Sequence, residues 1–154
     1  MNRTELAYRR TAADAPGGLG LLIGLFDTLA GDLRRAADAQ RENDIEQRCR
    51  EVRHALLVLG HLEDWVKRGE DGILARKLIA FYSSLRRKLT EAEVRKSAEI
   101  FERQMAAVLE LRKYWQQIES RTESSGPEIL LPEFRIPAGY PDPQIESGRG
   151  SWSA

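Results

Sequence analysis

The residues of this chain that could take part in chemistry are one cysteine, two histidines and the carboxylates near them. Glu51 and His54 form a Glu-x-x-His motif, the spacing that supplies ligands to di-iron sites in helical bundles. Such a site needs a second motif of the same kind, yet Val58 stands three residues before the other histidine, His61. We therefore interpret Glu51 and His54 as solvent-facing polar residues and expect no bound metal ion.

Cys49 could act as a nucleophile only with a base beside it. His54 follows five residues later, which places it about 140° away around a helix of 3.6 residues per turn. We expect Cys49 to be a free thiol buried in an apolar helical stripe, and the protein to be neither an enzyme nor a cofactor carrier. A metal-binding or redox bundle is an alternative, less favoured because the second motif is missing.

Two further patterns point weakly to nucleotides and nucleic acids. The stretch GGLGLLIG has the glycines of a dinucleotide-binding loop, but that loop follows a β-strand and the preceding TAADAP has no strand pattern. The 24 Lys and Arg residues balance 24 Asp and Glu residues, so the chain lacks the basic surplus of a nucleic-acid binder. Basic pairs such as Arg34–Arg35 alternate with acids, as on solvated helix surfaces. We expect no nucleic-acid partner.

Apolar residues recur every three or four positions in four stretches, which is the pattern of amphipathic helices. The stretches run from Leu19 to Ala36, Ile45 to Val66, Leu74 to Leu89 and Val94 to Ile118. Short polar breaks separate them. Helices of this length with short connections pack antiparallel, so we predict an all-α, up-down-up-down four-helix bundle.

Capping residues mark the expected helix starts. Asn43, with Glu46 three residues later, is predicted to cap the second helix. Thr90 and Glu93 form a capping box predicted to open the fourth helix. Three glycines lie inside the first helix: Gly20, Gly24 and Gly31. Each costs about 1 kcal/mol relative to Ala, which suggests the close approach of a neighbouring backbone or a bulky side chain.

The chain divides into three parts. Residues 1–15 form a polar arm, residues 16–119 the bundle, and residues 120–154 a Pro-rich, extended or disordered tail with scattered apolar residues. The N-terminus has no signal-peptide pattern, and the longest apolar run is too short to span a bilayer. We expect a cytoplasmic protein.

Several apolar residues lie off the four stripes: Leu57, Val58, Trp65, Ile79, Tyr82, Leu109 and Tyr114. They could widen the buried faces of the helices. They could instead form an exposed apolar groove, the kind of surface that receives a helix or an extended peptide.

Short phrases in a fixed order carry a family resemblance. They comprise Ala7, Tyr8 and Thr11 in the arm, Leu21, Leu22, Leu25, Phe26 and Asp27 in the first helix, Leu78, Phe81, Tyr82, Leu89 and Ala92 in the third, and Leu111, Arg112 and Trp115 in the fourth. In this order and spacing the chain resembles the flagellin-export chaperones of the FliS family. Gly24, Thr28 and Glu93 depart from the usual Met, Gly and Asn, and the Pro-rich tail is unusual for the family.

The resemblance implies an ATP-independent export chaperone. Members bind the disordered C-terminal segment of flagellin, prevent its premature polymerisation and hand it to the flagellar export apparatus. The candidate client-binding residues are Tyr8, Leu57, Trp65, Ile79, Tyr82 and Leu109. A divergent bundle that serves as an adaptor or regulator for another protein segment is the alternative.

Both ends of the chain are expected to regulate this surface. We expect the arm around Tyr8 to cover part of it until flagellin displaces the arm. The tail segments Ile129–Leu131 and Phe134–Ile136 are expected to dock on the groove, in the same chain or on a second copy through self-association.

Overall fold

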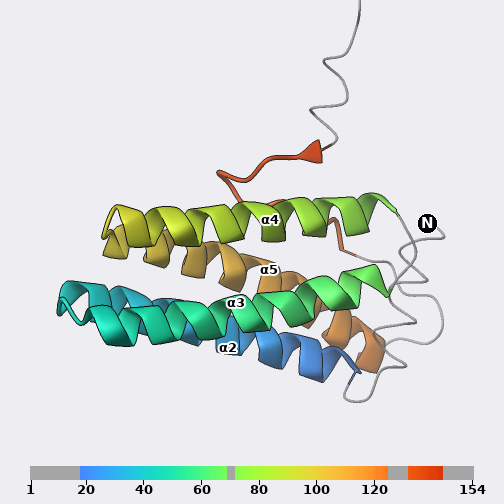
Figure 1. Ribbon diagram of the computed structural model, residues 1–154. Coiled ribbons are helices and arrows are strands. Elements are labelled where there is room, and N and C mark those ends of the chain that lie inside the picture. The colour runs from blue at the N-terminus through green and yellow to red at the C-terminus, as the bar shows by residue number, and fades with distance from the viewer. Residues whose placement is uncertain (1–17, 69–71, 125–131, 144–154) are drawn as a thin grey trace, which may run out of the picture.

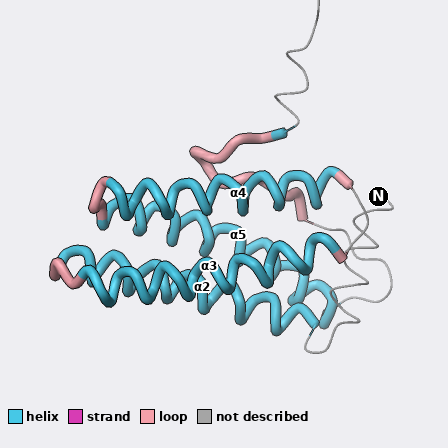
Figure 2. Tube along the Cα trace, viewed as in Figure 1, coloured by secondary structure: helices cyan, strands magenta, loops and turns pink. Residues whose placement is uncertain are grey.

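The computed structural model describes residues 18–68, 72–124 and 132–143. These ranges contain no strand and four α-helices: α2 (Gly18–Arg41), α3 (Ile45–Lys67), α4 (Ile73–Val94) and α5 (Ala98–Ser124) (Figures 1 and 2). The all-α fold class is confirmed for this part of the chain. The last helix continues past the predicted end of the bundle at Glu119. None of these helices is long and apolar enough to cross a membrane.

The four helices lie alongside one another, and each runs opposite to the one before it (Figure 1). The backbone of α2 packs closely along α3 and α5, whereas α4 comes near its two neighbours at fewer positions. Side-chain size explains this difference, because helix separation depends on the side chains at the contact. The buried side of α2 includes four alanines: Ala30, Ala36, Ala37 and Ala39. Of the five largest fully buried side chains, Phe26 comes from α2, whereas four come from α4 and α5: Phe81, Tyr82, Phe101 and Trp115.

The four predicted stripes form the core. Their buried members are Leu22, Phe26, Leu29, Leu33 and Ala36 on α2, Val52, Leu59, Leu62 and Val66 on α3, Leu74, Leu78, Phe81, Leu85 and Leu89 on α4, and Phe101, Val108, Leu111, Trp115 and Ile118 on α5. Ile45 departs from the prediction, because half of its surface is exposed. The expectation of a fully buried Cys49 thiol is also wrong. It is partly buried, and its Sγ lies 3.8 Å from the carboxylate of Glu93 on α4.

The turn between α2 and α3 uses Asp44, where the sequence predicted Asn43 as the cap. The Asp44 side chain accepts a hydrogen bond from the Gln47 amide at 3.1 Å, which satisfies one of the free donors at the start of α3. Asn43 instead adopts a left-handed conformation with φ of 57°. Its amide and that of Asp44 close the end of α2 by hydrogen bonds to the carbonyls of Gln40 and Ala39.

The turn between α4 and α5 corrects a second prediction. Thr90 opens no helix, because α4 continues to Val94 and the Thr90 hydroxyl donates to a carbonyl one turn earlier. Ser97 caps α5, since its hydroxyl accepts the Ile100 amide at 3.3 Å. Lys96 before it has φ of 50°, so this turn repeats the left-handed stop and polar cap of the first turn. Val94, predicted to be buried in the fourth stripe, is exposed.

Two leucines on α3 provide a matched test of the core. Leu59 is completely buried, whereas 63% of Leu57 is exposed. We expect Leu59→Ala to lower the free energy of unfolding by about 2–5 kcal/mol, because it leaves a cavity in the core. Leu57→Ala should change it by less than about 0.5 kcal/mol. Urea unfolding followed by circular dichroism measures both, and equal losses would contradict this placement of the two side chains.

Candidate functional site

The candidate client-binding residues separate into exposed and buried groups. Leu57, Ile79 and Leu109 are exposed on α3, α4 and α5, and Trp65 is partly buried on α3. Tyr8 lies outside the described residues. The exposed leucines and isoleucine are available to a partner without any rearrangement of the core.

Tyr82 does not belong to this exposed group. Only 1% of it is accessible, and its ring packs edge-on against Phe81 with the ring centroids 5.8 Å apart. The prediction that it lines an exposed groove is therefore wrong in this conformation. Val58 and Tyr114, two other off-stripe residues, are buried as well. For these three positions the wider buried face was the correct interpretation.

The exposed apolar residues lie along different seams, where a seam is the line along which two neighbouring helices meet. Ile79 stands seven residues before Arg86, so both project from the same side of α4. The Arg86 guanidinium bonds Glu63 of α3 at 2.6 Å. Ile79 therefore faces the α3–α4 seam.

The other two residues lie beside α2. Leu109 stands one turn before Arg112, whose Nε is 2.5 Å from a carboxylate oxygen of Asp27 on α2. Trp65 stands three turns after His54, which bonds α2 from α3. Leu109 thus faces the α2–α5 seam and Trp65 the α2–α3 seam. The structure distributes the candidate residues over three sides of the bundle and does not gather them in one groove.

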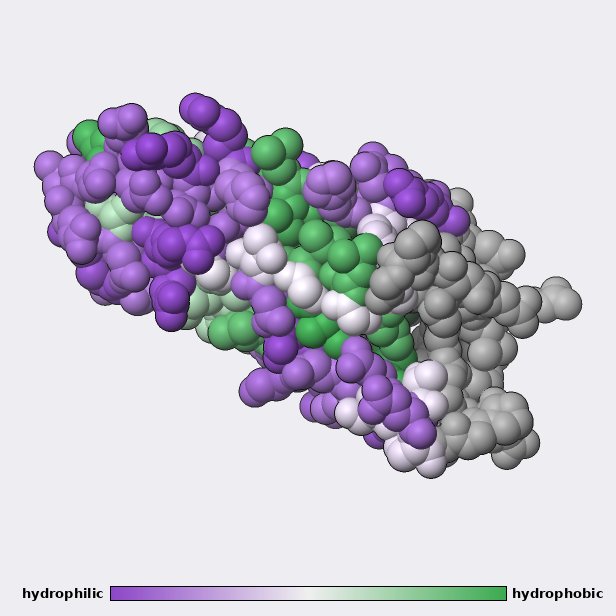
Figure 3. All heavy atoms as spheres, turned by 90° about the horizontal axis from the view of Figure 1, so that it is seen from below, coloured by the Kyte–Doolittle hydropathy of each residue, from purple (hydrophilic) through white to green (hydrophobic). Residues whose placement is uncertain are grey.

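The exposed side of α2 adds apolar surface that the sequence analysis missed. Leu21 is 46% exposed, and Leu25 is partly buried beside it. Among the described residues, and apart from the adjoining residues and backbone of α2 itself, no atom lies within 4 Å of a Cβ added at Gly20 or Gly24, so the predicted close neighbour is not found at either position. We call Gly20, Leu21, Gly24 and Leu25 the α2 face. Viewed from below, where α2 lies, the molecule shows an apolar band between two polar regions (Figure 3).

A polar cluster links α2 to α3 next to this surface. Asp32 is buried, and its carboxylate lies 2.7 Å from Nδ1 of His54 and 2.7 Å from the guanidinium of Arg35. Arg35 also bonds Glu51 at 3.1 Å. The prediction that Glu51 and His54 only face solvent is wrong, because both take part in interhelical pairs. Among the described residues no group of three His, Cys, Asp or Glu side chains is placed to hold a metal ion.

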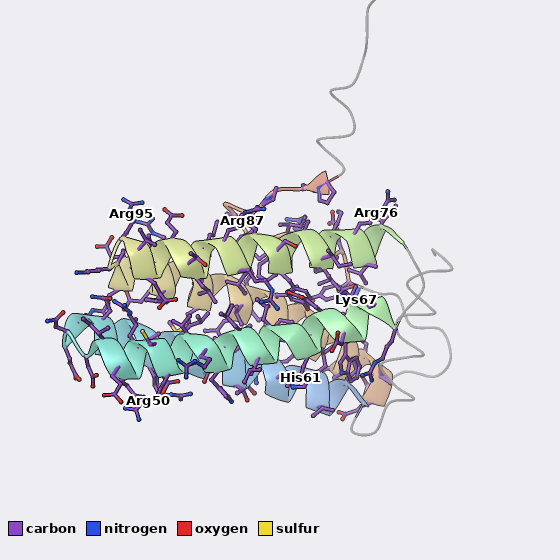
Figure 4. The ribbon with its side chains drawn as sticks, viewed as in Figure 1. Arg50, His61, Lys67, Arg76, Arg87 and Arg95 are labelled. Atoms are coloured by element: carbon purple, nitrogen blue, oxygen red, sulfur yellow. The ribbon has the colours of Figure 1, made fainter. Side chains whose placement is uncertain are left out.

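The consecutive basic residues Arg86, Arg87 and Lys88 on α4 point in several directions. Arg86 pairs with α3, and the Lys88 ammonium bonds the carbonyl of Gly139 in the tail. Figure 4 shows Arg76, Arg87 and Arg95 projecting from the outer side of α4, away from the other helices. The run is therefore divided between interhelical contacts and solvent, and it makes no continuous basic surface on this helix.

Part of the tail lies on the α4–α5 seam, and we call residues 132–143 the strap. The Phe134 ring packs edge-on against Tyr114 of α5, with centroids 5.0 Å apart. The Tyr140 ring packs on Phe81 of α4 at 4.4 Å. In Figure 1 the strap emerges between these two helices and then crosses α4. The Phe134 segment thus docks within one chain, but on the α4–α5 seam and not on a groove formed by the candidate client-binding residues. Ile129–Leu131 lie outside the described residues.

The polar cluster generates a pH-dependent prediction. Burial raises the pKa of the Asp32 carboxyl above its usual value, although the hydrogen bond from His54 and the charges of His54 and Arg35 act in the opposite direction. A raised pKa means that the folded state binds the Asp32 proton more tightly than the unfolded state does. The contribution of Asp32 to the free energy of unfolding therefore increases as the pH falls from the raised pKa towards the ordinary carboxyl pKa of about 4.

Asp32→Asn removes this titration. The free energy of unfolding of the wild type, minus that of the variant, should therefore rise as the pH is lowered from neutral through this range. Urea unfolding at several pH values measures the difference. A difference that falls with decreasing pH would show that the pairing with His54 and Arg35 outweighs burial.

Comparison with known proteins places the chain in a family. Residues 1–122 match the family described as Flagellar protein FliS. No curated protein matches the chain as a close relative. The family match covers α2, α3, α4 and nearly all of α5, and it ends before the strap. The chain therefore belongs to the FliS family, a family of flagellar export chaperones.

Proposed function

We propose that this chain binds the disordered C-terminal segment of flagellin in the cytoplasm, keeps it from polymerising and delivers it to the export apparatus. The proposal is supported by the family match and by one observation in particular. Large apolar side chains remain exposed or only partly buried on three seams of the bundle: Ile79 and Leu109 are exposed, and Trp65 is partly buried. Exposed apolar surface of this kind usually marks a binding site.

The distribution of these residues favours a client that wraps around the bundle. Trp65, Ile79 and Leu109 face three different seams, so one short helix in one groove could not contact all of them. A segment that is disordered when free can place successive amphipathic helices in successive seams. Ordering such a segment costs free energy, and a long interface is needed to offset that cost.

The α2 face gives a starting point for this interface. The missing side chains of Gly20 and Gly24 allow a client backbone to approach α2 closely. Leu21 and Leu25 stand beside them and provide apolar contact. This arrangement also gives a reason for glycines that weaken α2 and that have no close neighbour in the described structure.

Binding in this proposal requires no nucleotide. The glycine-rich stretch belongs to α2 from Gly18 onward, and it follows no strand in the described residues. Gly24 lies in the helix interior, where backbone amides are already hydrogen-bonded, and the preceding TAADAP lacks the strand pattern that a dinucleotide-binding loop requires. We therefore assign these glycines to client contact and expect an ATP-independent chaperone.

Titration of the purified protein with a flagellin C-terminal segment tests the function. We expect one client segment to bind per chain. The heat released on binding and an increase in the helical circular dichroism signal should report helix formation in the client. Leu21→Glu should weaken binding by at least about tenfold, because it places a charge in an interface that excludes water.

Val94→Glu provides the matched control. Val94 is also an exposed apolar residue, but it lies at the turn between α4 and α5 and belongs to no seam described above. This variant should bind the client as the wild type does. The proposed function fails if the folded wild type binds no flagellin segment, and the assignment of the α2 face fails if both variants bind equally well.

A further inference from the structure

The strap covers the α4–α5 seam, where it contacts aromatic side chains of both helices. The α2–α3, α3–α4 and α2–α5 seams carry Trp65, Ile79 and Leu109. The α4–α5 seam carries aromatic side chains too, but Phe81 and Tyr114 are in contact with the strap. The fourth seam is therefore apolar like the others and differs in being already occupied.

Tyr140 is the main anchor of the strap. Its ring lies on Phe81 with centroids 4.4 Å apart, and its hydroxyl donates a hydrogen bond to the side-chain carbonyl of Gln104. Gln104 is only 4% exposed, and its amide group donates to the carbonyl of Ile100 at 3.0 Å. The carbonyl end of this buried glutamine thus points to the Tyr140 hydroxyl, which gives the seam a polar group matched to a tyrosine.

A tight turn presents Tyr140 to the seam. The Tyr140 amide donates to the carbonyl of Pro137 at 3.3 Å, and Gly139 between them has φ of 88°. This left-handed conformation suits glycine and strains other residues. Lys88 of α4 binds the outside of the turn, because its ammonium donates to the Gly139 carbonyl at 2.7 Å and lies 4.0 Å from the centre of the Tyr140 ring.

The strap is built of few contacts. The rings of Phe134 and Tyr140, the turn at Gly139 and the long Lys77–Asp142 ion pair at 3.9 Å connect it to the helices, and Pro137 is buried, while Glu133 and Arg135 are exposed. The strap has 12 residues, from 132 to 143, whereas each partner of a stable complex contributes about 20–30 residues to the interface. The family match ends at residue 122, so the strap is an addition to the part of the chain that the family shares.

We propose that the strap is an intramolecular competitor that occupies the α4–α5 seam and must leave it before a client segment can bind there. The inference rests on the proposed function for the identity of the client. The strap presents extended backbone with two aromatic anchors, which are groups that a client segment can replace. If the strap were bound for about nine tenths of the time, the apparent affinity for a client at this seam would fall about tenfold.

Hydrogen exchange on the full chain tests whether the strap is docked, without any client. We expect peptides from residues 132–143 to exchange at least about tenfold more slowly in the wild type than in Tyr140→Ala. Gly139→Val is the second variant, because it strains the turn while leaving the helices intact. Arg135→Ala is the matched control within the strap and should exchange as the wild type does. Wild-type exchange as fast as in an isolated strap peptide would overturn the proposal.

Titration with the flagellin C-terminal segment then tests competition. Gly139→Val and Tyr140→Ala should bind the client about tenfold more tightly than the wild type and Arg135→Ala. If both variants release the strap but the affinity stays unchanged, the strap is only a structural brace and the proposal is wrong. If neither the wild type nor any variant binds flagellin, the proposed function has failed. The hydrogen-exchange experiment uses no client, so it still shows whether the strap docks on the helices.

Discussion

The difference in side-chain size between the two halves of the core determines much of this structure. Alanines on the buried side of α2 let its backbone pack closely on α3 and α5. The rings of Phe81, Tyr82 and Trp115 keep α4 further from its neighbours and fill the space themselves. Rings of this size reach the edge of the helix pair, so the α4–α5 seam needs a cover that the other seams do not. The strap supplies that cover, with Tyr140 against Phe81 and Phe134 against Tyr114.

The polar contacts hold the seams in register while leaving apolar surface between them. Asp32–His54, Glu63–Arg86 and Asp27–Arg112 each join two helices, and each lies on the same side of its helix as an exposed or partly buried apolar residue. Single pairs of this kind contribute little net stability when they are exposed. Their consequence here is geometric, because a fixed register keeps Trp65, Ile79 and Leu109 in constant positions for a partner.

Hydrophobic periodicity was sufficient to predict the core, because Phe26, Leu59, Leu85 and Leu111 all follow the helical repeat and are all buried. It could not place the helix ends, since Thr90 and Ser97 are both good capping residues about two turns apart and the local sequence does not distinguish them. Leu57 and Tyr82 show the limit for the site. Both lie off the stripes, yet one is exposed and the other buried, and the difference depends on how far each helix rotates against its neighbours. The contact of Asp32 with His54 and that of Tyr140 with Gln104 join residues far apart in the chain, so no local pattern predicts them.

A chaperone that offers apolar surface must also avoid binding itself. The chain carries equal numbers of acidic and basic residues, so net-charge repulsion does little to keep two copies apart. Uncovered apolar seams on such a molecule can therefore bind a second copy of the chain. An intramolecular cover is effective at any protein concentration, because its effective concentration depends only on the length of its connection to α5. The Lys88 contact with Gly139 and Tyr140 holds the turn in place when the strap is docked. Covering the most aromatic seam in this way leaves three seams free to begin binding, and the client can gain the fourth only after the rest of its interface has formed.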